Sequence, residues 1–261
     1  MSETPYVLVS RSEGVVTLTL NRGERFNPLS LAMITALASE LEALAADPQA
    51  RVVVLAAAGK GFCAGHDLRE MRAHVDDPAW QRELFLRCGR MMVQLTCLPQ
   101  PVIARVHGIA TAAGCQLVSM CDLAVASSDA KLALPGVSVG VFCSTPAVGV
   151  VRSVGRKRTM EMLLTGEPID AARALEWGLV NRVVPAEQLD DEIGRLTASV
   201  LSRSSAVVGL GKSAFYDQVE LELEDAYRSA AEAMTANMAL QDAAEGIDAF
   251  VGKRRPVWRD R

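Results

Sequence analysis

Residues 109–118 of this chain read IATAAGCQLV, a run of small residues that ends in a glycine and continues into an apolar segment. Because small side chains and Gly114 let the backbone come close to a bound molecule, the run indicates a turn at a ligand site. A helix that follows this turn points its free N–H groups and the positive end of its dipole toward the ligand. Gln116 follows in this expected helix, and its amide, unlike a carboxylate, cannot carry protons near neutral pH.

The segments on either side of this run alternate between expected strands and helices. Runs of β-branched and aliphatic residues predict strands over 15–20, 51–56, 102–106 and 123–126. Helices are expected over 30–46, with Ser30 as the N-cap, and from 78 to the residue before Pro99. Residues 59–65 and 108–114 are expected to be a loop and a turn. This repetition of strand, turn and helix predicts an α/β core with parallel pairing.

The pattern changes after about Pro185. Residues 186–201, 213–216, 221–240 and 243–255 are rich in alanine, leucine and charge, which predicts helices and no further strand. Apolar residues fall on more than one face of the helices after Ser205, so one small core cannot cover them all. We expect a core region over 1–200 and a C-terminal helical oligomerisation region over 201–261.

Composition excludes several classes of protein. Of 261 residues, 50% are hydrophobic and 22% are charged, and the formal net charge is −4. No basic field is available for nucleic acid, and the longest apolar runs, such as 51–58, are too short to cross a bilayer. Residues 1–5 show neither a basic start with an apolar stretch nor an arginine-rich transit pattern, which predicts a cytosolic location.

The cysteines and histidines do not indicate a metal site. The 6 cysteines lack Cys-x-x-Cys spacing and lie in apolar surroundings, which favours buried free thiols. The 3 histidines, His66, His74 and His107, show no metal-ligand spacing. We expect no cofactor and no metal.

Several segments together resemble a known family. They are LNR at 20–22 with NPL at 27–29, GFCAGHDL at 61–68, and PVIA at 101–104, which leads through GCQL at 114–117 to CDL at 121–123. The match continues to LLTGE at 163–167 and GIDAFVGKR at 246–254. The chain resembles the crotonase (enoyl-CoA hydratase/isomerase) superfamily, and AAGCQL at 112–117 with FCSTP at 142–146 is similar to its enoyl-CoA hydratase domain-containing protein three subgroup. The resemblance implies a spiral of ββα units with a C-terminal helical trimerisation region.

The resemblance also implies an oxyanion hole, made by the N–H groups of His66 and Ala113, where the family usually has glycine at the second position. The residue pattern agrees, because Gly65 gives the backbone of one turn conformational freedom and Gly114 stands at the expected start of a helix. Ordinary turn glycines are the alternative. The His66 imidazole has two interpretations, a general acid or base and a side chain that packs on CoA or on the next helix. Cys115 is either a helix-terminus nucleophile or, as we favour, a small packing residue.

The ligand that the family binds is an acyl-CoA. The resemblance places Phe250 and Lys253 of a neighbouring subunit at the adenine and the 3′-phosphate. It places the Ala64 carbonyl near the adenine amino group, with Lys60 and Arg69 as further phosphate candidates. It therefore predicts a homotrimer or a dimer of trimers, with no nucleic-acid or membrane partner.

The chain departs from the family at its acid/base residues. Hydratases of the family use two glutamates, and these positions match Gln116 and Gly136. Ser144 matches the aspartate of dienoyl-CoA isomerases. The other candidate residues near the expected oxyanion hole, which include Ser138 and Cys143, are uncharged. Each acid/base partner contributes about 10²- to 10⁴-fold in rate, so we expect ordinary hydration to be very slow.

Three functions remain open from the sequence. The first is an enzyme that forms a thioester enolate without a strong base, for example by decarboxylating a malonyl-type thioester. The second is a non-catalytic acyl-CoA binding or carrier protein. The third is a weak hydratase or isomerase in fatty-acid metabolism that works through His66 or Asp67, and Asp67 is also a candidate for substrate contact. A protease with the same spiral fold is a distant fourth, because Cys115 and Gln116 stand where an activated serine is needed.

Overall fold

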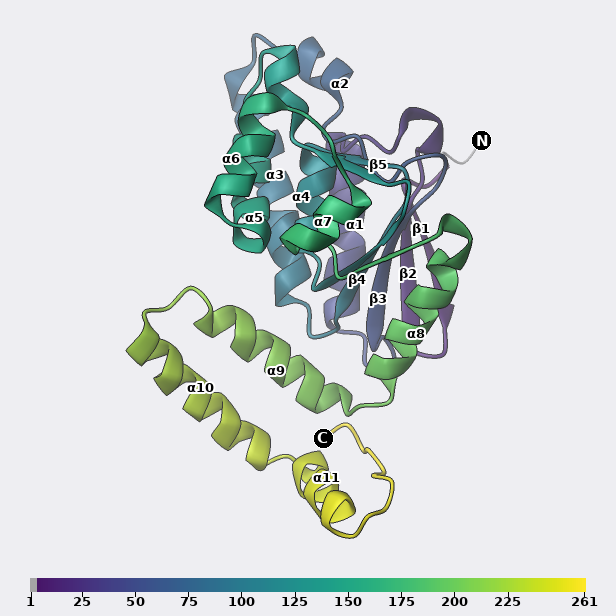
Figure 1. Ribbon diagram of the computed structural model, residues 1–261, viewed down its shortest axis with the longest axis vertical. Coiled ribbons are helices and arrows are strands. Elements are labelled where there is room, and N and C mark those ends of the chain that lie inside the picture. The colour runs from purple at the N-terminus through teal and green to yellow at the C-terminus, as the bar shows by residue number, and fades with distance from the viewer. Residues whose placement is uncertain (1–3) are drawn as a thin grey trace.

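The computed structural model describes residues 4–261 and contains two β-sheets surrounded by helices (Figure 1). The larger sheet has the strand order β1-β2-β3-β4-β6-β9, and the smaller one has the order β5-β7-β8. The strands are β1 (Val7–Ser12), β2 (Val15–Leu20), β3 (Val52–Ala57), β4 (Val102–Val106), β5 (Ile109–Thr111), β6 (Leu123–Ser127), β7 (Lys131–Ala133), β8 (Ile169–Asp170) and β9 (Arg182–Val184).

The helices cover both faces of the larger sheet and continue beyond it at the C-terminus. They are α1 (Leu31–Ala45), α2 (Leu68–Ala73), α3 (Pro78–Cys97), α4 (Ala113–Met120), α5 (Ser144–Val154), α6 (Arg156–Thr165), α7 (Ala171–Trp177), α8 (Leu189–Leu201), α9 (Ser205–Gln218), α10 (Leu223–Met238) and α11 (Gln241–Val251). Short 3-10 turns occupy Gly23–Arg25, Pro135–Val139 and Ala186–Gln188. No helix in this part of the chain is long and apolar enough to cross a membrane.

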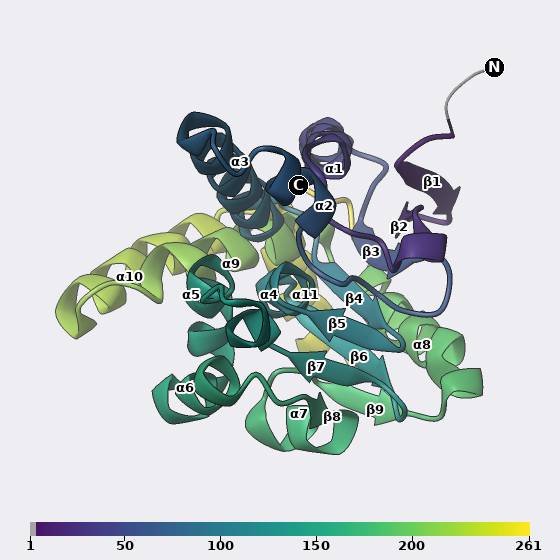
Figure 2. The same cartoon turned by 90° about the horizontal axis from the view of Figure 1, so that it is seen from above.

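Strands β2, β3, β4, β6 and β9 pair in parallel, and β1 adds an antiparallel edge. The predicted α/β core with parallel pairing is therefore confirmed. Ser30 is the N-cap of α1 as predicted, since its hydroxyl accepts a hydrogen bond from the N–H of Met33. The turn expected over 108–114 is wrong in one respect, because residues 109–111 form β5 and pair with β7. Figure 2 shows these two short strands beside the ends of β4 and β6.

The core lies on the two faces of the larger sheet, and β3 shows how the sequence produces it. All six residues of β3 are buried, because helices cover both faces. Val53 and Leu55 belong to the larger apolar cluster, which includes residues of α1, α3 and α4. Val52 and Val54 belong to a smaller cluster with residues of α8. The alternation follows from the two-residue repeat of a strand.

The C-terminal helices α9, α10 and α11 extend away from the sheet (Figure 1). The short helix expected over 213–216 is wrong in length, since α9 begins at Ser205 behind the N-cap Ser204. The last expected helix is also too long, because α11 ends at Val251 and Lys253 has a left-handed φ of 51°. As expected, apolar side chains here lack cover within the chain, with Leu223 74% and Met234 60% exposed.

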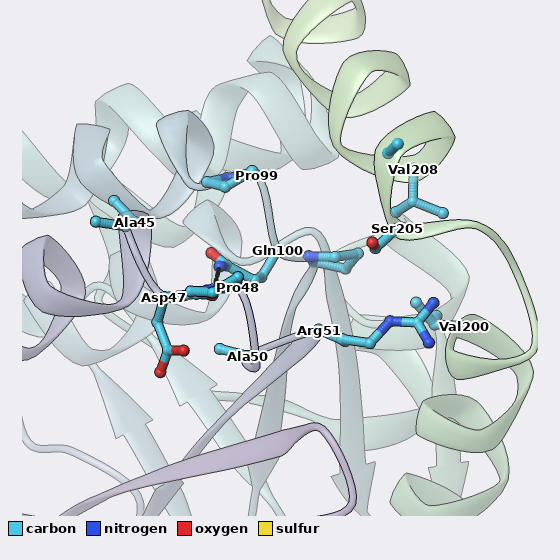
Figure 3. Close-up of a pocket in the computed structure, with 13 residues that line it drawn as sticks. Ala45, Asp47, Pro48, Ala50, Arg51, Pro99, Gln100, Val200, Ser205 and Val208 are labelled. Carbon is cyan, nitrogen blue, oxygen red and sulfur yellow. Dashed lines mark hydrogen bonds between the residues drawn. The ribbon is translucent and has the colours of Figure 1, made fainter. Parts of the chain in front are cut away.

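A cleft of about 310 Å³ lies where this helical region joins the core (Figure 3). Figure 3 shows Gln100 pointing toward Asp47, whose carbonyl accepts a hydrogen bond from its amide. From the other side of the cleft, Arg51 donates to the carbonyl group of Arg203 and lies 3.6 Å from the carboxylate of Asp260. The two contacts of Arg51 tie the C-terminal segment to the start of β3, far away in the sequence.

A buried ion pair fixes α9 to the core. The Lys212 ammonium donates to the carboxylate of Asp122 at 2.6 Å and to the carbonyl groups of Leu95 and Gln100. The hydroxyl of Tyr216, one turn further along α9, donates to the other oxygen of Asp122 at 2.9 Å. Only 7% of the Lys212 side chain is exposed, so water cannot replace these contacts.

Replacing Lys212 with methionine is expected to lower the free energy of unfolding by about 3 kcal/mol, because it leaves a mostly buried carboxylate without its counter-ion. Urea unfolding followed by circular dichroism measures the change. The exposed Lys157 of α6 is the matched control, and Lys157→Met is expected to change the stability by less than about 0.5 kcal/mol. Equal unfolding curves for the two variants would show that the ion pair does not anchor α9.

Candidate active site

A cavity of about 360 Å³ opens beside the N-terminus of α4. Its walls come from three parts of the chain: the segment after β3, the apolar side chains of α2 and α3, and the segment that runs from Pro135 into α5. No aspartate, glutamate, lysine or arginine lies among the lining residues of the described chain. The lining includes Ala64, His66, Met71, Phe85, Ala112, Gly136, Ser138, Cys143 and Ser144.

Two backbone segments touch at the mouth of this cavity because two residues lack a Cβ. Gly65 has a φ of +91°, and a Cβ there would lie 3.2 Å from the nitrogen of Ala113 and 2.8 Å from the Cβ of Ala112. A Cβ on Gly114 would lie 2.1 Å from the carbonyl oxygen of Cys63. Both glycines are therefore required by the close contact of the two segments.

The contact lies next to two N–H groups, those of His66 and Ala113. Ala113 is the first residue of α4, so its N–H has no acceptor within the helix. The neighbouring turn is held by a hydrogen bond of 2.8 Å from the N–H of Leu29 to the carbonyl group of Gly65, which leaves the following N–H, that of His66, outside this bond. Backbone donors of this kind, when they point to one place, can bind an oxygen atom that carries negative charge.

Ala112 has a strained backbone at this junction. Its φ of 50° and ψ of −119° are rare for a residue with a Cβ. Ala113, at the position where the family usually has glycine, is the first residue of a regular helix instead. The positive φ therefore falls on Ala112, one position before the residue where the family usually has glycine.

The His66 imidazole packs on α3. Its ring meets the ring of Phe85 edge-on, with centroids 5.4 Å apart. Burial lowers the pKa of His66 to about 4, so the ring is neutral near pH 7. Its Nε2 atom is buried and has no hydrogen-bond partner among residues 4–261. The ring therefore packs on α3 in the neutral form, and its role toward a bound molecule stays a prediction.

The residues at the two glutamate positions differ in their surroundings. The side chain of Gln116 is only 4% exposed, and its Oε1 has no partner within the described chain. It lies in α4 and is not among the lining residues of the cavity. Gly136 does line it, but a Cβ there would lie 2.4 Å from the carbonyl oxygen of Val141. Since its φ is not in the left-handed region, space rather than backbone conformation requires this glycine.

The other predicted site residues are only partly brought together. Ser144 lines the cavity at the start of α5, and Ala64 lines it as well, although the carbonyl group of Ala64 accepts a hydrogen bond from the hydroxyl of Thr111 at 3.1 Å. Lys60 and Arg69 are exposed and lie outside the lining. Phe250 is 85% exposed on α11, and α11 lies at the opposite end of the molecule from α2 (Figure 1).

Asp67 is a correction to the sequence analysis. Its carboxylate caps α2 by accepting hydrogen bonds from the N–H groups of Arg69 and Glu70. It also forms an ion pair with Arg25 at 2.7 Å. Because these contacts occupy both of its oxygens and it does not line the cavity, the assignment of Asp67 to substrate contact or base catalysis is wrong.

The cysteines are mostly as expected. Five of them are buried, but Cys97 is exposed at the end of α3, which corrects the prediction for that residue. Burial raises the pKa of Cys115 to about 12, so this thiol stays protonated near neutral pH. The nucleophile alternative for Cys115 is therefore wrong, and the packing interpretation holds. No group of residues suited to a metal ion occurs in the described part of the chain.

Comparison with known proteins identifies the family. Residues 10–261 match the family model described as enoyl-CoA hydratase/isomerase. The chain belongs to the enoyl-CoA hydratase/isomerase family. It is 45% identical to the mitochondrial enoyl-CoA hydratase domain-containing protein 3 of Xenopus laevis, over 99% of this chain and 87% of that protein. The expected resemblance to this subgroup is confirmed.

Solved structures of relatives confirm the crotonase fold. A crystal structure of an enoyl-CoA hydratase from Mycobacterium smegmatis is 54% identical, with a TM-score of 0.96 over 98% of this chain and 99% of that one. The crystal structure of human enoyl-CoA hydratase domain-containing protein 3 is 43% identical, with a TM-score of 0.93 over 97% of this chain and 100% of that one.

The expected cytosolic location is contradicted by the comparison. The domain-containing protein 3 relatives from frog, rat and human are all named mitochondrial. The prediction was wrong because it took the composition of residues 1–5 as a sign of location. The signals that direct a protein to a compartment are short segments apart from the folded domain, and the residues of the core carry no record of them.

Replacing Ala112 with glycine is expected to raise the free energy of unfolding by about 1 kcal/mol, since relief of a left-handed alanine exceeds the entropy that glycine adds to the unfolded chain. Ala113→Gly is the matched control, and there we expect a small loss because Ala113 is helical. Urea unfolding at one pH compares the three proteins. A loss of stability in both variants would contradict the strain at Ala112.

Proposed function

We propose that this protein binds an acyl-CoA and polarises its thioester carbonyl with the N–H groups of His66 and Ala113. The observation that supports this most is the close contact of Gly65 with the nitrogen of Ala113, beside a cavity lined by no aspartate, glutamate, lysine or arginine of the described chain. In comparable sites one such donor contributes about 3 kcal/mol to transition-state binding. The apolar side chains of the lining, such as those of Met71 and Phe85, suit the acyl group.

Within this frame, the reaction that we propose is decarboxylation of a 2-carboxyacyl thioester. Loss of carbon dioxide leaves its electron pair in a thioester enolate, which the two N–H groups stabilise, and no base is needed. A carboxylate loses solvation when it enters a cavity with no cationic side chain, and departure as neutral carbon dioxide relieves that cost. The neutral His66 ring, with its free Nε2, adds no charge that would hold the carboxylate back.

Hydration places a different demand on the site, which this chain does not meet. Addition of water needs one group to take a proton from water and another to return a proton to the α-carbon. Gln116 is an amide, and the backbone of Val141 fills the space next to Gly136. The position of the second glutamate therefore cannot accept one without rearrangement. Weak hydration through His66 remains the lesser alternative.

A second candidate is a non-catalytic acyl-CoA carrier. The observation that favours it is the burial of Gln116, which leaves the cavity without any strong proton carrier. A carrier needs only the apolar cavity and the two backbone donors. It differs from the decarboxylase in one measurable respect, the release of carbon dioxide.

A purified sample is expected to release carbon dioxide from malonyl-CoA or methylmalonyl-CoA and to hydrate crotonyl-CoA far below about 10 s⁻¹, the median turnover of enzymes. Headspace mass spectrometry of labelled carbon dioxide and the absorbance of the enoyl thioester measure the two reactions. Tight binding of both thioesters with no carbon dioxide would support the carrier instead. Crotonyl-CoA turnover above that median would contradict the proposal.

The nucleotide of the CoA requires a second copy of the chain in this proposal. Phe250 and Lys253 lie on or just after α11, at the far end of their own chain from the cavity. The exposed apolar side chains of α10, such as Leu223 and Met234, provide the surface that a trimer or a dimer of trimers would cover. In such an assembly α11 of one subunit reaches the cavity of the next.

Lys253→Glu is expected to weaken binding of butyryl-CoA at least tenfold, or about 1.4 kcal/mol, because it places a negative charge beside the 3′-phosphate. Binding of butyryl-pantetheine, which has no nucleotide, is expected to stay the same. Calorimetry measures both, and Lys157→Glu, in exposed α6, controls for the change of net charge. Equal losses for both ligands, or a monomer in light scattering, would contradict the shared site.

A further inference from the structure

We propose that Cys143 is the group that delivers a proton to the enolate carbon, an inference that rests on the proposed decarboxylation. Cys143 lines the cavity together with His66 and Ala112, and it is 6% exposed. The donor pair and the thiol therefore face the same enclosed space. The sequence names Cys143 only among the uncharged candidates near the site, without a role.

The position of the sulfur explains why a glycine stands at 136. A Cβ on Gly136 would lie 2.8 Å from the Sγ of Cys143, too close for any real contact. The thiol thus takes the space into which a side chain at position 136 would extend. A proton-bearing group is present at the same wall of the cavity, although it comes from the start of α5 and not from the 135–139 turn.

A second observation points to a polar ligand in this space. His66 lines the same cavity, and its Nε2 atom is buried and has no hydrogen-bond partner within residues 4–261. A buried polar atom without a partner is costly, and a bound molecule with a polar group removes that cost. The cavity is therefore suited to a ligand that carries both apolar and polar parts, such as a 2-carboxyacyl thioester.

The surroundings of Cys143 suit a thiol that gives up a proton and regains it. Burial raises the pKa of the thiol, which keeps it protonated near neutral pH, and a hydrogen bond from the N–H of Gly136 acts in the opposite direction. Cys143 is also the N-cap of α5, whose N-terminal dipole favours a negative charge on the sulfur. The thiolate left after proton transfer is thus stabilised at its place.

The step balances without any further reactant. The bond between C2 and the carboxylate breaks, carbon dioxide leaves, and the electron pair forms the enolate. C2 then takes the proton from the S–H bond of Cys143, and the charge on the enolate oxygen passes to the sulfur. Water returns a proton to the thiolate and leaves as hydroxide, so the net change is the replacement of the carboxylate by hydrogen, with carbon dioxide and hydroxide released. No oxidant or reductant takes part.

The test uses methylmalonyl-CoA in D₂O, because its product carries a new stereocentre at C2. We compare the wild type with Cys143→Ala, Cys143→Ser and the control Cys97→Ala, which removes an exposed thiol outside the cavity. The first readout is the stereochemical purity of the deuterated propionyl-CoA, scored on the product formed. The second is the exchange of the C2 protons of propionyl-CoA with D₂O, in which the same group acts in reverse.

The wild type and Cys97→Ala are expected to give one stereoisomer and to catalyse the exchange. Cys143→Ala is expected to give a nearly racemic product and at least 100-fold slower exchange, the usual lower bound for loss of a proton carrier. Cys143→Ser, close in shape and able to donate a proton, is expected to restore most of the stereochemical purity.

The two proposals fail in different ways. If the wild type releases no carbon dioxide but catalyses exchange, and Cys143→Ala does not catalyse it, the decarboxylation is disproved and Cys143 is kept as the proton carrier. Stereochemistry and exchange that are the same in Cys143→Ala and the wild type would overturn the assignment of Cys143. A wild type that neither releases carbon dioxide nor catalyses exchange would overturn both.

Discussion

The site depends on one close backbone contact, between the turn at Gly65 and the N-terminus of α4. A Cβ on Gly65 would touch both Ala112 and the nitrogen of Ala113, and a Cβ on Gly114 would overlap the carbonyl oxygen of Cys63. The parallel strands β3 and β4 carry the two segments to the same edge of the sheet, so the fold brings them together. In the proposed function, this contact is what allows the N–H groups of His66 and Ala113 to face one oxygen atom.

The neutrality of the cavity follows from how its walls are built. Asp67, the carboxylate that follows His66 in the sequence, is held at the start of α2 by two N–H groups and by Arg25. Burial keeps His66 neutral, and the sulfur of Cys143 fills the space beside Gly136. A site of this kind can stabilise an enolate on two N–H groups, but it cannot draw a proton from water with a carboxylate. In the proposed function, the electron pair of the enolate therefore comes from the bond between C2 and a carboxylate and not from a C–H bond that a base would have to break.

Sequence predicted the features that depend on local pattern and missed those that depend on distant neighbours. The β-branched runs of β2 and β3 and the cap at Ser30 were readable because each is a local preference. Strand β8, of two residues, is too short to show a period, and the long α9 was missed because its anchor, Asp122, lies about 90 residues away in the chain. The role of Asp67 was misjudged for the same reason, since its ion-pair partner Arg25 comes from another segment.

The most direct test of the central claim is the carbonyl stretching frequency of a bound thioester, isotope-labelled at the carbonyl carbon and followed by infrared difference spectroscopy. The account predicts a shift to lower frequency on binding to the wild type, because two N–H groups polarise the carbonyl. Gly65→Ala is expected to lose the shift. Gly155→Ala, with a similar φ of +82° and no neighbour within 4 Å of its Cβ, is expected to keep it. A wild-type frequency equal to that of the free thioester in water would contradict the account.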